Sequence, residues 1–387
     1  MSDTSASLAT PPSLERAGGG GGDGEHGAVA PPPPLLDVQH LQVLFPVRRG
    51  LLRRSVEYVH AVDDVTLVLN EGETLGVVGE SGCGKTTLIR CLARLVDATG
   101  GVIRFRGKDI THAGRRQLGD VRAELQMVFQ DPQASLNPRK RVAQILATPL
   151  RLRGMPRSEV PAQTRELLER VGLNPEHLNR YPHEFSGGQR QRIGIARALA
   201  MQPRLIMLDE PVSALDVSIQ AQVINLLDEL QDELGLSYVF VAHDLSVVRH
   251  VSDRIAVMYL GKVVEVSPAE ELYLKPIHPY TEALLSAIPI PDPRENRQRM
   301  RVVVQGEPPN PVAPPSGCRF HTRCEFASEI CNTAEPPLVE YPGGHLAACH
   351  HPRKVSAQEI ASARRSEASP HSAGLELPQP PAAPAAV

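Results

Sequence analysis

The chain has 387 residues, which is enough for two or three domains with a sizeable core. Its formal net charge of -3 and pI near 6.5 give no overall attraction to nucleic acid. The amino terminus shows no signal-peptide pattern and no apolar run approaches a membrane span, so we expect a cytosolic protein that meets a membrane only through partners. Its six cysteines disfavour a disulfide scaffold and suggest metal binding or catalysis.

The beginning of the chain is rich in glycine and proline, with runs at 18–22 and 31–34 and few large apolar side chains. Such a segment cannot offset the entropy lost on ordering, so we expect a disordered arm over residues 1–35. Apolar residues then alternate with others at 41–45 and again at 65–69. This period of two predicts strands of a small antiparallel sheet.

Residues 79–86 follow an apolar strand pattern at 74–78, and a helical apolar pattern begins at Leu88. They read G-x-x-x-x-G-K-[ST], the pattern of a phosphate-binding loop between a strand and a helix. Glycines let successive N–H groups point inward, and the positive end of the helix faces the same cavity. We therefore expect a polyphosphate site, in which Lys85 reaches the β and γ phosphates and Thr86 ligates Mg²⁺. The predicted nucleotide contacts in this loop are Gly79, Glu80, Ser81, Gly82, Cys83, Gly84, Lys85, Thr86 and Thr87.

Two aromatic residues upstream of this loop are candidates for stacking on adenine. Phe45 stands at the end of the first strand pattern, although a core aromatic at a strand end is the alternative interpretation. Tyr58 competes for the stacking role, because the insertion at 48–58 leaves the register of this region open.

An apolar strand pattern at 125–129 ends at Gln130. A glutamine at the tip of a core strand can contact a metal-bound water and a neighbouring domain, and loop capping is the alternative role. Residues 131–202 then hold helical patterns that are punctuated by proline and rich in arginine, without interleaved aromatic residues. This composition favours a helical subdomain over a nucleic-acid surface.

A short polar motif, Ser186-Gly187-Gly188-Gln189, stands at the start of a helical stretch, where backbone N–H groups can bind an anion. Alone this is a weak signal. It gains weight because an apolar strand pattern with two carboxylates at its end follows at 205–210.

Those carboxylates belong to Asp209 and Glu210, and alternation along a strand points them in different directions. We expect Asp209 to help hold Mg²⁺ and Glu210 to polarise the attacking water as a general base. Two acids that cap the next helix are the alternative. A buried-type strand at 238–242 is followed by His243. A parallel-type strand would place this histidine at the sheet edge that carries the phosphate loop, so we expect it to contact the γ-phosphate.

In their order and spacing, these motifs resemble those of an ATP-binding cassette (ABC) ATPase over about residues 36–350. The resemblance implies an α/β fold: a P-loop NTPase (RecA-like) core with an antiparallel β subdomain and an α-helical subdomain. The nucleotide-binding domain is expected at 36–266, with its helical subdomain at about 131–202. The resemblance implies catalytic roles for Gln130, Glu210 and His243, and magnesium binding by Thr86, Gln130 and Asp209. Beside the phosphate loop, the residues implied to bind nucleotide are Phe45, Gln130, Asp209 and the signature Ser186, Gly187, Gly188 and Gln189.

Three further stretches resemble the peptide-importer branch of that family: residues 130–139, the His-Pro-Tyr-Thr motif at 278–281, and a cysteine-bearing segment near the carboxyl terminus. The resemblance implies an ATPase that energises import of oligopeptides or dipeptides. Nickel and glutathione importers share much of this pattern and remain alternatives. An exporter ATPase is a weaker one. A soluble ABC ATPase acting on nucleic acid or ribosomes should carry two cassettes or a long coiled-coil insertion, and neither is present.

The resemblance also implies partners. In this branch two ATPase chains pair head to tail, so that ATP on one phosphate loop is capped by the signature of the other chain. We therefore expect a second ABC ATPase subunit, in a heterodimer, with two transmembrane permeases and an extracytoplasmic peptide-binding protein. The chain would lie at the cytoplasmic face of the inner membrane, as a peripheral subunit, and nucleic acid would not be a partner.

Cysteines gather in a proposed carboxyl-terminal extension at 267–353, with the spacing C-x₅-C-x₆-C-x₁₇-C. A metal can fix such a segment in place of a core, but the spacing alone does not separate a Cys₄ zinc site from an iron–sulfur cluster. The resemblance favours a [4Fe–4S] cluster over Zn²⁺. A disordered tail is expected at 354–387. The predicted ligands are Cys318, Cys324, Cys331 and Cys349, with His321, His345, His350 and His351 near enough in sequence to replace one of them.

Overall fold

The computed structural model describes residues 33–49, 55–288, 304, 306–360 and 363. Nearly all of the predicted arm and most of the predicted tail lie outside these residues. In the part of the chain that is described, no helix combines the length and the apolar character that crossing a membrane requires.

The smaller of two sheets has four strands in the order β2-β1-β4-β5. Leu41 pairs with Val65 across β1 and β2, and both side chains are fully buried. The antiparallel sheet predicted from the alternating pattern is therefore confirmed. Its strands are β1 (Leu36–Arg49), β2 (Ser55–Leu69), β4 (Gly100–Phe105) and β5 (Lys108–Asp109).

The larger sheet has eight strands in the order β11-β12-β10-β9-β3-β8-β7-β6. Strands β6, β7, β8, β3 and β9 run parallel, and every residue of β3, β7 and β8 is buried. Such strands carry apolar runs because both faces of the sheet are covered. The strands are β3 (Thr74–Val78), β6 (Leu125–Val128), β7 (Leu205–Asp209), β8 (Ser237–Val241), β9 (Arg254–Tyr259), β10 (Lys262–Pro268), β11 (Val339–Tyr341) and β12 (His345–Ala347).

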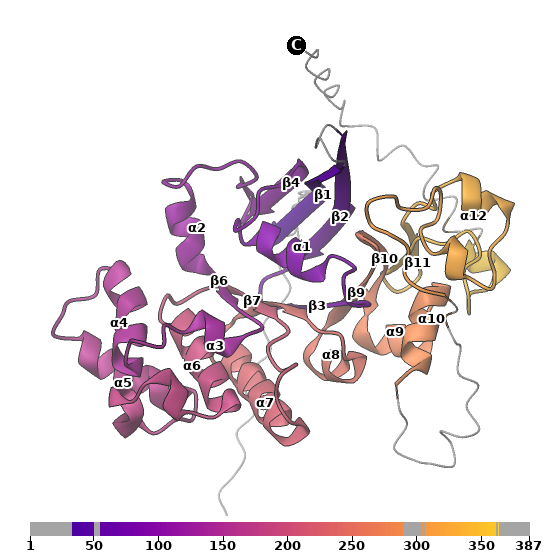
Figure 1. Ribbon diagram of the computed structural model, residues 1–387. Helices are drawn as coiled ribbons and strands as arrows, with labels where there is room; N and C mark the ends of the chain where they lie inside the picture. Colours follow the sequence, from indigo (N-terminus) through magenta and orange to yellow (C-terminus); the bar gives the residue numbers. More distant parts are fainter. Residues whose placement is uncertain (1–32, 50–54, 289–303, 305, 361–362, 364–387) are drawn as a thin grey trace, which may run out of the picture. The chain divides into compact units, whose positions relative to one another are not determined.

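Helix α1 (Lys85–Leu92) lies between the two sheets (Figure 1). Its buried Leu88 and Ile89 share one apolar core with Val43 of β1 and Val77 of β3. The helix that begins at the phosphate loop thus packs against both sheets, which fixes the direction in which its first turn points.

Most other helices of the nucleotide-binding region belong to a second core. Helices α3 to α6 lie together in Figure 1 and connect β6 to β7, and α7 and α8 follow β7 and β8. Asp216 caps α7 by accepting a hydrogen bond from the N–H of Ile219. The helices are α2 (Leu118–Glu124), α3 (Pro132–Ser135), α4 (Val142–Leu152), α5 (Val160–Arg170), α6 (Gly187–Leu199), α7 (Val217–Leu234) and α8 (Leu245–Val251), with the 3₁₀ turns η1 (Pro175–Asn179) and η2 (Pro182–Glu184).

The carboxyl-terminal extension is joined to the larger sheet, since its strand β12 pairs with β10. Fully buried Glu265 of β10 accepts hydrogen bonds from the His345 ring (2.6 Å) and from the backbone N–H groups of Ile277 (2.7 Å) and His278 (3.0 Å). A buried carboxylate needs such partners, so this one ties two parts of the extension, around Ile277 and around His345, to the core. The extension contains α9 (Ala269–Leu274), α10 (Pro279–Ser286), η3 (His321–Arg323), α12 (Glu329–Thr333), β11 and β12.

Residues 354–360 and 363 of the tail expected at 354–387 are described by the structure. Val355, Ile360 and Ala363 pack against Ile277 and Tyr341 of the extension, and Ala363 is buried.

Gly76 of β3 offers a test of how tightly the central sheet is packed. A Cβ atom there would lie 2.4 Å from Cγ1 of Val248 and 2.6 Å from Oγ of Ser252. We expect Gly76→Ala to lower the free energy of unfolding by about 1–3 kcal/mol, as overpacking of a core does. Urea unfolding of the full chain measures this. Gly114→Ala is the control, because a Cβ at Gly114 meets nothing within 4 Å. Equal loss in both variants would contradict the tight packing.

Candidate functional site

The phosphate-loop sequence joins β3 to α1 and is packed against other strands at two glycines. Gly79 and Gly84 have φ angles of 151° and 110°, in the region that favours glycine. A Cβ atom at Gly79 would lie 2.2 Å from the carbonyl oxygen of Met258, and one at Gly84 would lie 2.0 Å from that of Ala61. The loop therefore requires glycine at both ends, for backbone conformation and for space.

Lys85 folds back into the loop. Its buried Nζ donates hydrogen bonds to the carbonyl oxygens of Gly79 (2.7 Å) and Glu80 (3.1 Å). The ammonium group thus sits where the backbone curls, next to the first turn of α1, whose N–H groups have no partner within the helix. A polyphosphate at this place would meet a positive charge and the positive end of a helix dipole.

Asp209 and Thr86 meet at the end of β7. The Thr86 hydroxyl donates to Oδ1 of Asp209 (2.9 Å), while the buried Oδ2 has no hydrogen-bond partner and lies 3.6 Å from the Arg90 guanidinium. Burial raises the pKa of Asp209, and the Thr86 hydrogen bond and the Arg90 charge lower it. A hydroxyl oxygen beside an unsatisfied carboxylate oxygen is a donor set that suits Mg²⁺, so the residues present fit this ion.

Gln130, Glu210 and His243, from the ends of three neighbouring strands, converge on one another. Nε2 of Gln130 donates to Oε2 of Glu210 (2.8 Å), and Nδ1 of His243 lies 3.4 Å from the same oxygen. Glu210 has a φ angle of 45°, a conformation that residues other than glycine rarely adopt and that often marks functional sites. The structure thus brings together the three residues that the sequence predicts to be catalytic.

The signature motif occupies the start of α6. The Ser186 hydroxyl accepts a hydrogen bond from the N–H of Gln189 (3.3 Å), and the Gln189 side chain accepts one from the N–H of Ser186 (3.0 Å). This reciprocal cap fixes the first turn of the helix. Gly188 is packed so closely that a Cβ atom there would lie 2.3 Å from Ile219 of α7. Within this chain the motif thus contacts α7.

The two candidates for adenine stacking lie on neighbouring strands. Phe45 of β1 and Tyr58 of β2 have exposed fractions of 40% and 47%, and the partner of Tyr58 in the strand pairing is Pro46. Phe45 is therefore not the core residue that the alternative interpretation required. Both rings are available to a ligand, and the choice between them stays open.

Two features of the site were not predicted from the sequence. Arg90 follows Thr86 by one helical turn, and that spacing is the signal that could have placed it beside Asp209. Glu80 of the phosphate loop is bonded to Tyr280 and to Arg323, both in the carboxyl-terminal extension. Residues so distant in sequence leave no local pattern that connects them.

The cysteines of the extension lie near one another. The pKa of Cys349 is raised to about 12 by burial, and the thiols of Cys318, Cys324 and Cys331 add to the shift. The N–H of Cys318 also donates to the carbonyl oxygen of Cys331 (2.9 Å). Among the residues that the structure describes, however, no group of three or more His, Cys, Asp or Glu side chains is arranged to hold a metal ion. The predicted metal centre is thus not preformed in these side-chain positions.

This geometry is that of a P-loop ATPase: a phosphate loop, an acceptor pair suited to Mg²⁺, and a carboxylate positioned by an amide and an imidazole. Comparison with known proteins makes the class more specific. Residues 62–213 match the ABC transporter family, and residues 264–331 match the family described as oligopeptide/dipeptide transporter, C-terminal region.

Relatives match over most of the chain. The oligopeptide transport ATP-binding protein AppF of Bacillus subtilis (strain 168) is 54% identical over 318 residues, which cover 82% of this chain and 97% of the relative. The oligopeptide transport ATP-binding protein OppF of Salmonella typhimurium (strain LT2) is 52% identical over 319 residues, which cover 81% and 95%.

Among solved structures, the dimeric ATP-binding cassette MJ0796, in a post-hydrolysis state bound to ADP and Pi, matches with a TM-score of 0.54 and 28% identity. That match covers 60% of this chain and 98% of the other. The chain belongs to the ABC transporter ATPases, in the group that carries the oligopeptide/dipeptide transporter carboxyl-terminal region. It is an ATP-hydrolysing enzyme.

Replacement of Glu210 tests its catalytic role. We expect Glu210→Gln to bind ATP with little change in affinity, because the amide keeps the shape of the carboxylate and the phosphate loop is untouched. Turnover should fall by roughly 10²- to 10⁴-fold, the contribution of a general base. ATP binding and steady-state phosphate release on the same preparation measure the two quantities. Turnover close to that of the unaltered chain would remove Glu210 from this role.

Proposed function

We propose that this chain energises the import of oligopeptides or dipeptides across the cell membrane as one ATPase subunit of a multi-subunit ABC transporter. The observation that carries the proposal is the combination of a complete hydrolytic site with the oligopeptide/dipeptide carboxyl-terminal region in one chain. The peptide transport ATP-binding proteins named above match this chain over almost their whole length. Nickel or glutathione import by the same machinery is the alternative.

In the proposed mechanism, Lys85 binds the β and γ phosphates after its amine leaves the loop carbonyls that it now contacts. Mg²⁺ held by Thr86 and Asp209 would offset the phosphate charge. Glu210 accepts a proton from the attacking water, and Gln130 and His243 orient its carboxylate through their contacts with Oε2. Lys85 and Thr86 stand in the first turn of α1, and Gln130, Asp209, Glu210 and His243 stand at or just after the ends of parallel strands.

The proposal includes a head-to-tail pair of ATPase chains, in a heterodimer. The signature at the start of α6 is exposed at Ser186 and Gly187, so it is free to cap ATP held by another chain. Two permeases and an extracytoplasmic peptide-binding protein complete the assembly, with this chain peripheral at the cytoplasmic face of the inner membrane. The segment after Gln130, which leads into α3 to α6, is the part proposed to contact the permeases.

A transport assay tests the proposal. The chain is reconstituted in proteoliposomes with permeases, partner ATPase and binding protein of a peptide importer, and uptake of labelled peptides, Ni²⁺ and glutathione is measured with Glu210→Gln as the matched control. We expect ATP-dependent peptide accumulation that the Glu210 variant loses by roughly 10²-fold or more. Accumulation of Ni²⁺ or glutathione in place of peptide would select the alternative substrate, and ATP hydrolysis unaffected by the permeases would count against a transport role.

We also propose that the four clustered cysteines bind a metal centre, a [4Fe–4S] cluster in preference to Zn²⁺. Support comes from the mutual effect of the thiols on the pKa of Cys349 and from the family match, which spans Cys318, Cys324 and Cys331. Thiols with raised pKa values need a cation before they deprotonate, and a metal ion supplies that charge. Metal binding would draw the side chains into a ligand geometry that they do not have in its absence.

Metal analysis of anaerobically purified protein tests this centre. We expect iron and sulfide with a brown visible spectrum, and we expect Cys331→Ser to lose the metal. Cys91→Ser is the matched control, because Cys91 is a buried residue of α1 and belongs to a different core. Stoichiometric zinc would favour the alternative centre. Metal retained in single replacements of all four cysteines would refute the site.

A further inference from the structure

Glu80, the second residue of the phosphate loop, is held from two directions by the carboxyl-terminal extension. Nη1 and Nη2 of Arg323 donate to the two oxygens of its carboxylate, at 2.8 and 3.0 Å. The N–H of Glu80 donates to the hydroxyl of Tyr280 (2.9 Å). Both the side chain and the backbone of this loop residue are therefore fixed by parts of the chain that lie about two hundred residues further on in sequence.

The Arg323 guanidinium is itself held in place. Its side chain is only 7% exposed, and it lies 5.9 Å from the centre of the Tyr259 ring, to whose hydroxyl it also donates (3.3 Å). Tyr259, Tyr280 and Phe320 form a cluster with ring centres 4.7 to 5.3 Å apart. A bidentate arginine on a rigid aromatic support keeps one geometry, so its contact with Glu80 is specific in direction as well as charge.

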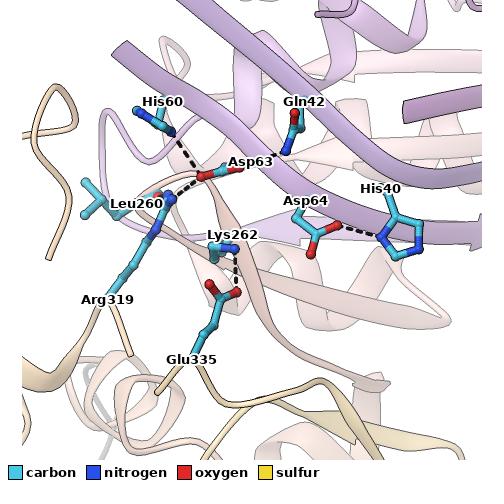
Figure 2. A network of polar contacts seen from close by, with 9 residues as sticks. All are labelled: His40, Gln42, His60, Asp63, Asp64, Leu260, Lys262, Arg319 and Glu335. Atoms are coloured by element: carbon cyan, nitrogen blue, oxygen red, sulfur yellow. Dashed lines mark hydrogen bonds and ion pairs between the residues drawn. The ribbon is translucent and has the colours of Figure 1, made fainter. Parts of the chain in front are cut away.

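The segment that carries Arg323 is anchored to the nucleotide-binding core through Arg319 and Glu335 (Figure 2). Arg319 donates to the carbonyl oxygen of Leu260 and to the carboxylate of Asp63 on β2, and Lys262 pairs with Glu335. The turn after Leu260 in turn touches the phosphate loop, since the N–H of Gly261 donates to the carbonyl oxygen of Cys83 (2.8 Å). The extension and the phosphate loop thus both contact the turn at Leu260 and Gly261.

The contact between Arg323 and Glu80 also affects the charge of the phosphate loop. Glu80 places a negative charge in a loop that must accept a polyphosphate, and a free carboxylate there would repel the ligand. Arg323 neutralises that charge and holds the Glu80 carboxylate against the extension. Lys85 then remains as the charge of the loop that faces the phosphates, with its amine on the Gly79 and Glu80 carbonyls until ATP arrives.

We propose that Arg323 is a positioning residue for ATP binding: by holding Glu80, it keeps the phosphate loop in its binding shape and removes a repulsive charge, so that the carboxyl-terminal extension sets the affinity of the site for ATP. The inference requires only that the chain binds ATP, and it stands apart from the identity of the transported solute. It also gives the His-Pro-Tyr-Thr motif a local role, because Tyr280 of that motif holds the backbone of the same residue.

A double-mutant cycle in the full chain tests the proposal. The dissociation constant of Mg-ATP is measured by calorimetry for the unaltered chain, Arg323→Met, Glu80→Gln and the double variant. We expect Arg323→Met to weaken binding roughly tenfold, within the range of coupling between contacting charged residues, and to change affinity by less than about twofold when Glu80 is already Gln. The turnover at saturating ATP should change much less than the affinity, because Glu210 is not displaced.

Arg353→Met is the matched control. Arg353 belongs to the same extension, lies 4.1 Å from the centre of the Phe326 ring and pairs with Glu282, away from the phosphate loop. We expect its replacement to leave ATP affinity unchanged. Equal losses of affinity in the Arg323 and Arg353 variants, an undiminished effect of Arg323→Met in the Glu80→Gln background, or unchanged affinity in Arg323→Met would each overturn the proposal. Partial recovery in Arg323→Lys, which restores the charge without the bidentate geometry, would support it.

Discussion

The central strands of the larger sheet are covered on both faces, and the positions of Asp209, Glu210 and His243 in the site depend on this constraint. All residues of β3, β7 and β8 are buried, so an ionised side chain along them would be costly. Charged residues can appear only where the strands end. Because these strands are parallel and paired in register, their ends bring Asp209, Glu210 and His243 to the edge that also carries the phosphate loop.

Three carboxylates surround a site that must accept a polyphosphate, and each is compensated in a different way. Asp209 keeps one oxygen without a hydrogen-bond partner, which suits a magnesium ion. Glu210 is held by the amide of Gln130 and stays an acceptor for a proton. Glu80 is neutralised by Arg323. In the proposed mechanism the same carboxylate group thus serves as a metal ligand, a base and a structural anion, because its hydrogen-bond and charge partners differ.

Local motifs made much of the site predictable from the sequence. The phosphate loop at 79–86 and the carboxylate pair at 209–210 are each set by the spacing of residues that are close together in the chain. Apolar runs also identified the strands that carry them. Contacts between distant segments were not predictable: Glu80 and Arg323 are 243 residues apart, and β12 has only three residues. The pattern of four cysteines predicted their proximity, but not whether their side chains form a ready ligand set.

The exposed start of α6 gives the proposed pairing of two chains a physical basis. Its capping box satisfies two N–H groups at the start of the helix, and the remaining ones, with the helix dipole, favour an anion. Since the signature packs against α7 within its own chain, the ATP phosphates of a second chain are the anion that the proposed function supplies. The segment from Gln130 to the end of α6 is continuous, so a movement that closes the signature over ATP also moves the part proposed to contact the permeases. Hydrolysis and transport would then be linked because one helical segment takes part in both.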